Sequence, residues 1–208
     1  MKIDLHQSKS SMRAVAAPTV STRIWRGTRR LLKNRDGVAG IEFAFIAPIM
    51  ILMFIATVEF SQALTVDRRV TQIASSSADL ISRQRKITPQ EVNGVMQIID
   101  HLIRPFDPNL LRVTVVNVIA DIEDADTTTV CWSYQHNGGT NAYSEGQAYT
   151  LPEGIVEAGN SVIVAEVVYE YQPMIFQRFL TAGMPLRETF YLKPRQSSFV
   201  EYNGHKST

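Results

Sequence analysis

An apolar run from Val38 to Val58 constrains this chain more than any other feature. It reads VAGIEFAFIAPIMILMFIATV, and Glu42 is its one charged residue. An α-helix rises about 1.5 Å per residue, so the run covers about 30 Å, the thickness of a bilayer's hydrocarbon core. Its apolar residues surround the helix instead of forming one stripe, which is typical of a membrane span rather than a core helix. The run therefore predicts a transmembrane helix over residues 38–59.

The charges that flank this helix predict its orientation. Residues 1–37 carry nine Lys or Arg and two Asp, a formal charge of +7, although the whole chain has a net charge of only +1. Basic residues stay on the cytoplasmic side of a membrane span. Residues 1–37 are therefore predicted to be a basic cytoplasmic leader, and the C-terminal part is predicted to be exported. Because the leader adjoins a membrane span, topology explains its charge better than nucleic-acid binding, and we expect no nucleic-acid partner.

Three kinds of export signal fit this N-terminal region to different degrees. Ser61-Gln62-Ala63 loosely matches a signal-peptidase site, and Thr28 to Lys33 partly matches a twin-arginine signal. The third kind is a prepilin leader, which is cut on the cytoplasmic side after a glycine. The residues around Gly37 favour this third kind.

Residues 35–64, RDGVAGIEFAFIAPIMILMFIATVEFSQAL, resemble the N-terminus of TadE-like proteins, the pseudopilins or minor pilins of tight-adherence (Flp-type) pilus systems. The resemblance rests on a glycine after a basic leader, a Glu-Phe pair (Glu42-Phe43), a proline inside the apolar run (Pro48), and a second Glu-Phe pair (Glu59-Phe60). Residues 186–200, LRETFYLKPRQSSFV, are also similar to the family's C-terminal strand and its Pro-Arg ending.

This resemblance implies a processing event and a set of partners. A prepilin peptidase would cut between Gly37 and Val38, which makes Glu42 the fifth residue of the mature chain. The resemblance further implies that Glu42 pairs with the N-terminal amine of a neighbouring subunit, with Phe43 beside it in the helix-packing site. A carboxylate and an ammonium compensate each other in lipid, where either alone is costly. The implied partners are the membrane, the peptidase, other pseudopilins, the major pilin and an inner-membrane assembly platform.

The residues beyond the span predict a pilin-like α+β fold. Apolar residues recur every three or four positions, so the N-terminal helix should continue over residues 60–86. Thr88-Pro89-Gln90-Glu91 forms a capping box for a second helix, which Pro105 should end. The exported domain, residues 87–208, should hold an antiparallel sheet of about four strands with short connections. Glu166 and Glu170 alternate with apolar residues, so one face of the third strand should be wet. The expected strands cover residues 110–120, 129–135, 161–171 and 186–193. Residues 173–184 are expected to form an apolar short helix or loop.

No residue pattern in the chain indicates catalysis or a cofactor. The four acids in residues 121–126 lack the glycine and distal glutamate of a calcium loop, so we expect a solvated turn and no metal. Cys131, the one cysteine, is expected to be a buried small hydrophobe in a strand. The four histidines show no ligand spacing, and no hydrolase motif is present. We therefore expect a protein that is not an enzyme.

Together these features predict a membrane-anchored minor pilin or pseudopilin, needed for assembly of tight-adherence (Flp) pili. It would be a single-pass protein of a bacterial inner membrane, with its C-terminal domain in the periplasm. Two alternatives remain open. One is a retained single-pass protein whose periplasmic domain binds a ligand or the cell wall. The other is an exported enzyme, released by signal peptidase after Ala63.

Overall fold

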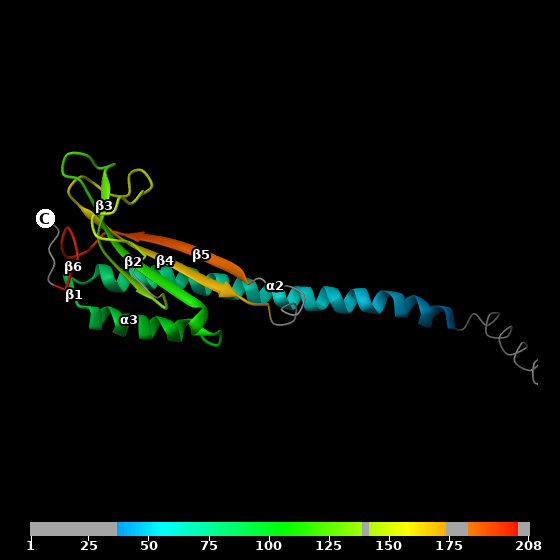
Figure 1. The fold of residues 1–208 in the computed structure, drawn as a ribbon. Helices are drawn as coiled ribbons and strands as arrows, with labels where there is room; N and C mark the ends of the chain where they lie inside the picture. The colour runs from blue at the N-terminus through cyan, green and yellow to red at the C-terminus, as the bar shows by residue number, and fades with distance from the viewer. Residues whose placement is uncertain (1–36, 139–141, 174–182, 204–208) are drawn as a thin grey trace, which may run out of the picture. The chain divides into compact units, whose positions relative to one another are not determined.

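The computed structural model describes residues 37–138, 142–173 and 183–203. The expected leader (1–36) and most of the expected apolar segment (174–182) lie outside these residues. The chain divides into two compact units, residues 1–53 and 54–208. In order, its elements are α2 (Val38–Ser82), β1 (Lys86–Ile87), α3 (Pro89–Leu102), the 3-10 helix η2 (Pro108–Leu110), β2 (Leu111–Ala120), β3 (Thr128–His136), β4 (Ser161–Tyr171), β5 (Met184–Leu192) and β6 (Glu201–Tyr202). The predicted α+β class, with a long N-terminal helix, is confirmed (Figure 1).

Helix α2 is one continuous helix of 45 residues. In its second half, buried residues recur at three- and four-residue spacing and form a stripe that packs against the sheet: Val66, Val70, Ile73, Ala74, Ser77, Ala78 and Ile81. Such a stripe is expected of a helix that lies on the surface of a domain. The predicted continuation of the helix beyond residue 59 is thus observed, and it ends at Ser82.

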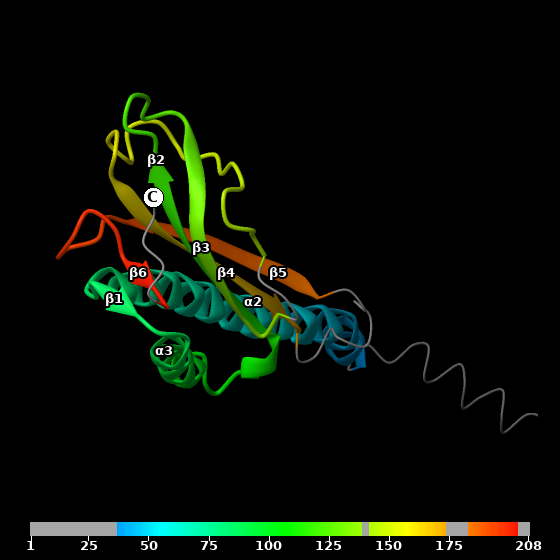
Figure 2. The same cartoon turned by 60° about the vertical axis from the view of Figure 1, so that its left-hand side comes forward.

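Helix α3 begins at the predicted capping box. The Thr88 side chain accepts a hydrogen bond from the Glu91 backbone N–H, and the Thr88 N–H donates to Glu91 Oε2 at 2.8 Å. These two bonds satisfy the backbone N–H groups of Glu91 and Thr88, which would otherwise lack partners at the start of the helix. Arg69 of α2 meets the other end of α3, where its Nη1 donates to the carbonyls of Leu102 (2.7 Å) and Arg104 (2.6 Å). Helices α2 and α3 lie side by side under the sheet (Figure 2).

Strands β2 to β5 form one fully antiparallel sheet with the order β3-β2-β4-β5. Helices α2 and α3 cover one face of it and bury the larger core, to which β4 contributes Ile163, Ala165 and Val167. The opposite face buries a second, smaller core, built on Val116, Val118, Val130, Val162 and Val164. The expectation of one wet face is therefore wrong for the first half of β4, where Val162 and Val164 are fully buried.

Residues 137–160 connect β3 to β4, and Tyr143, Tyr149, Leu151 and Ile155 of this connection cover the second core. The sheet order places β2 between the two strands, so the connection must cross β2, and the prediction of short connections is wrong here. Tyr143 and Tyr149 pin the connection to the sheet, since both hydroxyls donate to Glu166 Oε1, at 2.8 and 2.6 Å. Residues 139–141 of this connection lie outside the described part of the chain.

A C-terminal strap, residues 193–203, ties the sheet to the end of α2. The Val200 carbonyl, which is buried, accepts hydrogen bonds from Trp132 Nε1 (2.8 Å) and Asn117 Nδ2 (3.1 Å). The Arg195 backbone N–H donates to the Ser82 carbonyl at 2.9 Å, and β6 pairs with β1 in parallel. The strap thereby closes one end of the domain. The sequence patterns did not predict its contacts with α2 and the sheet.

The tyrosine pair on Glu166 makes stability sensitive to alkaline pH. Burial, with help from the Glu166 carboxylate, raises the pKa of Tyr143 to about 12. The unfolded chain loses this proton near pH 10, so the stabilisation is complete below pH 10 and is lost as pH rises through about 12. We predict that Tyr143→Phe flattens the fall in the urea midpoint between pH 10 and 12, measured on the full chain in detergent. An unchanged slope in Tyr143→Phe would contradict the assignment.

Candidate functional site on helix α2

The first half of α2 presents apolar side chains on all sides. Phe45, Phe54 and Phe43 are 75%, 70% and 68% exposed, and most apolar residues from Val38 to Leu64 are exposed as well. In water such a surface would be strongly unfavourable, so its solvent must be lipid or other apolar helices. Among the described residues, α2 is the one helix long and apolar enough to cross a membrane. This fits a single-pass membrane protein.

The predicted site residues gather in the first turns of α2. Gly37 directly precedes the helix, Val38 is its first residue, and Glu42 and Phe43 follow one turn later. All four are exposed, and within the part of the chain that the structure describes the Glu42 carboxylate forms no hydrogen bond or ion pair. The arrangement leaves Glu42 available to a partner.

Pro48 lies inside α2 without ending it. Proline has no N–H, so the carbonyl of Ala44 loses its usual helical donor. Membrane helices tolerate this loss when a neighbouring group or helix supplies the missing bond. The proline is therefore compatible with the span that the sequence predicts.

Glu59 occupies a different environment from Glu42. Its side chain is only 7% exposed, and the Tyr171 hydroxyl at the end of β4 donates to Glu59 Oε2 at 3.3 Å. Burial first, and then the Glu59 charge, raise the pKa of Tyr171. Phe60, the other half of this Glu-Phe pair, is 66% exposed. The pair thus places its acid toward the domain and its ring away from it.

Sequence reasoning named Glu59 only as part of a motif and missed its contact. A signal was present, because Glu59 lies seven residues before Val66 and eleven before Val70, which puts all three on one side of the helix. The roles of Arg69 and Arg195 were missed altogether. Arg195 forms an ion pair with Asp79 of α2 at 2.8 Å, a contact between residues too distant in sequence for local patterns to reveal.

The acidic stretch at residues 121–126 and Cys131 both have roles in the fold. The acidic stretch forms a turn in which Asp121 and Asp124 accept hydrogen bonds from backbone N–H groups two residues on. Cys131 lies in β3 as predicted, but it is half-buried rather than buried. Its side chain lies at the margin of the larger core.

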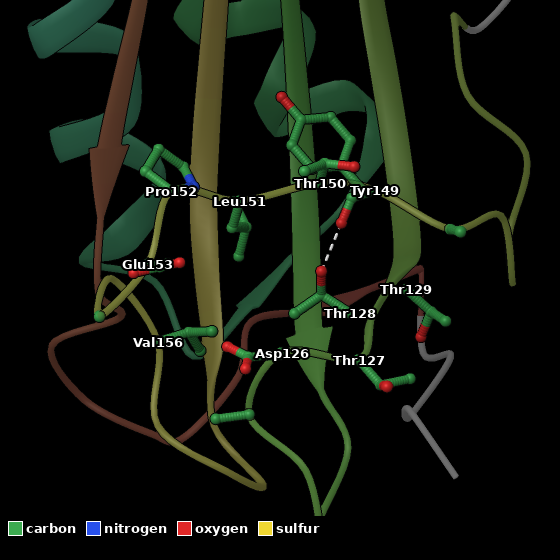
Figure 3. Close-up of a pocket in the computed structure, with 13 residues that line it drawn as sticks. Asp126, Thr127, Thr128, Thr129, Tyr149, Thr150, Leu151, Pro152, Glu153 and Val156 are labelled. Carbon is green, nitrogen blue, oxygen red and sulfur yellow. Dashed lines mark hydrogen bonds between the residues drawn. The ribbon is translucent and has the colours of Figure 1, made fainter.

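A pocket of about 730 Å³ lies between the start of β3 and the β3–β4 connection (Figure 3). Its lining brings together threonines with Asp126 and Glu153, and the Thr128 hydroxyl donates to the Tyr149 carbonyl. Histidine and cysteine do not line it. Across the described residues, no group of three His, Cys, Asp or Glu is placed to hold a metal ion.

The contact between Glu59 and Tyr171 can be tested by removing the hydroxyl. Tyr171→Phe deletes a donor to a buried carboxylate, which typically costs about 1–3 kcal/mol. We predict that the free energy of unfolding of the full chain, measured by urea denaturation in detergent, is lower by that amount. Adding Glu59→Gln to this variant should recover part of the loss, because an amide is less costly to bury than a charge. Wild-type stability in Tyr171→Phe would show that the bond contributes nothing.

Most of α2 is similar to a known protein family. The profile of the family described as TadE-like protein matches residues 37–79, from the glycine before α2 almost to the end of the helix. No curated protein matches the chain. No solved structure matches it either.

Proposed function

We propose, from the premise that this chain is a TadE-like protein of a Tad pilus system, that it acts as a minor pilin or pseudopilin in the assembly of tight-adherence pili. One observation carries the proposal: the first half of the helix that the family profile matches presents exposed apolar side chains on all sides. A helix of this kind can move from contact with lipid to contact with other helices at little cost, since both surroundings are apolar.

Processing and topology follow from this role. In the proposal, residues 1–37 stay in the cytoplasm of a bacterial inner membrane, residues 38–59 span it, and residues 87–208 form the periplasmic domain. A prepilin peptidase removes the leader between Gly37 and Val38. The exposed position of Gly37 before α2 supports access to this bond.

Glu42 is the proposed assembly contact. An ionised carboxylate in a membrane helix costs about 2.5–3.5 kcal/mol on insertion scales, so it gains from an ammonium partner. The new N-terminal amine of a neighbouring subunit supplies that charge, and Phe43 packs beside the pair. Because both groups lie in the first turns of α2, the pairing would set the axial register between neighbouring helices.

The role we propose is structural and involves no catalysed reaction. The partners are the peptidase, a second pseudopilin, the major pilin and the inner-membrane assembly platform. The periplasmic domain would prime, cap or guide the growing filament.

N-terminal sequencing of the membrane-bound protein tests the processing step. We predict a mature N-terminus at Val38, and accumulation of the uncut chain when Gly37→Leu blocks the peptidase. Gly37 has open space around its α-carbon, so the variant should still fold. An N-terminus at Met1 would instead support a retained anchor protein, and one near Leu64 would support a released enzyme.

Substitution of Glu42 tests the assembly contact. We predict that Glu42→Ala leaves membrane insertion and cleavage intact but lowers the yield of sheared pili at least tenfold, since a 1.4 kcal/mol loss per contact already changes an equilibrium tenfold. Ile41→Ala, which shortens the neighbouring exposed side chain but keeps the charge, is the matched control. Normal pili in Glu42→Ala would refute the proposed contact.

A further inference from the structure

A basic groove lies between α2 and the end of α3, outside the stripe of α2 that faces the sheet. It measures about 430 Å³. Its lining residues, which come from both helices, are Thr65, Arg68, Arg69, Gln72, His101 and Leu102. The four from α2 share one face of the helix, because they are spaced by three and four residues.

Arg69 is held rigidly at the inner side of this groove. Its Nη1 is fixed by the Leu102 and Arg104 carbonyls, and its guanidinium lies 5.9 Å from the centre of the Phe106 ring. These contacts fix the position of the charge before any ligand arrives. Binding at a preorganised cation loses less side-chain entropy than binding at a free one.

Arg68 and His101 supply the accessible groups. Both side chains are exposed. His101 Nδ1 contacts the Gln97 carbonyl at 2.8 Å, so the other ring nitrogen, Nε2, is the one left for a ligand. A guanidinium beside an imidazole is suited to an oxyanion, because planar N–H donors match phosphate oxygens.

The acids nearest in sequence do not line the groove. Asp67 precedes Arg68 but is absent from the groove lining. Asp100 precedes His101, and both of its oxygens contact His136 Nε2 of β3 at 3.0 Å. The groove therefore offers positive charge without a carboxylate in its lining.

The apolar surface of α2 continues to the edge of this groove. Phe54, Phe60 and Leu64 are 70%, 66% and 43% exposed, and Thr65 begins the groove directly after Leu64. Side chains on a helix lean toward its N-terminus, so Arg68 and Arg69 extend back over the turn that holds Leu64. Basic residues at such a boundary meet the phosphates of the bilayer surface.

We propose that this groove binds the phosphate of an anionic phospholipid headgroup, with Arg68 and His101 as ligands and Arg69 as a fixed third charge. The site anchors the domain to the bilayer surface at a defined rotation of α2. The proposal requires only that α2 enters a membrane, and it stands whether or not the protein assembles pili.

Native mass spectrometry of the full chain in a nonionic detergent can count bound lipids during titration with phosphatidylglycerol or phosphatidylcholine. A basic residue at an anionic lipid surface contributes about fivefold in affinity. Arg68→Gln should therefore weaken the tightest phosphatidylglycerol binding about fivefold, and Arg68→Gln with His101→Gln should weaken it further. Phosphatidylcholine binding should not change. Arg85→Gln is the matched control, because Arg85 is also exposed but follows the distal end of α2.

Three results would overturn the proposal. The first is equal phosphatidylglycerol binding by the Arg68 variants and Arg85→Gln. The second is an equal loss of both lipids in Arg68→Gln, since the groove would then not select an anion. The third is displacement of phosphatidylglycerol by millimolar inorganic phosphate, which would assign the groove to a free anion instead of a lipid. Unchanged thermal unfolding of the variants by circular dichroism excludes misfolding as the cause.

Discussion

Helix α2 must satisfy two different surroundings with one unbroken backbone, and the rest of the structure depends on this constraint. Its first half is apolar on all sides, whereas its second half is apolar only on the stripe that meets the sheet. A helix can enter both because its backbone hydrogen bonds lie within the segment itself. The change of pattern falls near Glu59, whose carboxylate is directed to Tyr171 while Phe60 remains on the exposed side. The surroundings of the helix thus change near Glu59, and the helix continues through this point without a break.

The domain is organised around the second half of this helix. The larger core uses its buried stripe, Arg69 holds the end of α3, and Arg195 returns the C-terminal strap to Asp79 and Ser82. The Arg69 and Arg195 contacts join α2 to residues more than thirty positions away in the chain. The membrane-spanning part and the folded part are therefore joined by continuous secondary structure, and a loop is not needed between them.

Local features of the sequence were enough to predict the elements. The apolar run, the capping box at Thr88 and the β-branched runs predicted the starts of α2 and α3, and they predicted the four strands to within two residues at each end, as expected where local pattern and fold agree. Helix α2 ends at Ser82, four residues before the predicted end. The features that were not predicted depend on contacts between residues distant in the sequence. The order β3-β2-β4-β5, the crossing connection and the second core require partners that no short window contains. Glu166, for example, alternates with apolar neighbours and suggests a wet face, but two tyrosines from the connection cover it. Gly37, Val38, Glu42 and Phe43 were named from the resemblance, and their roles remain predictions.

The strap has a consequence for the order of folding. Val200 fills the core and accepts bonds from Asn117 and Trp132, which precede it by 83 and 68 residues. Contacts between such distant residues form late, because a large loop must close before they stabilise anything. The core therefore stays open at that end until the strap joins the sheet, and the buried side chains of Asn117 and Trp132 lack their shared acceptor until then.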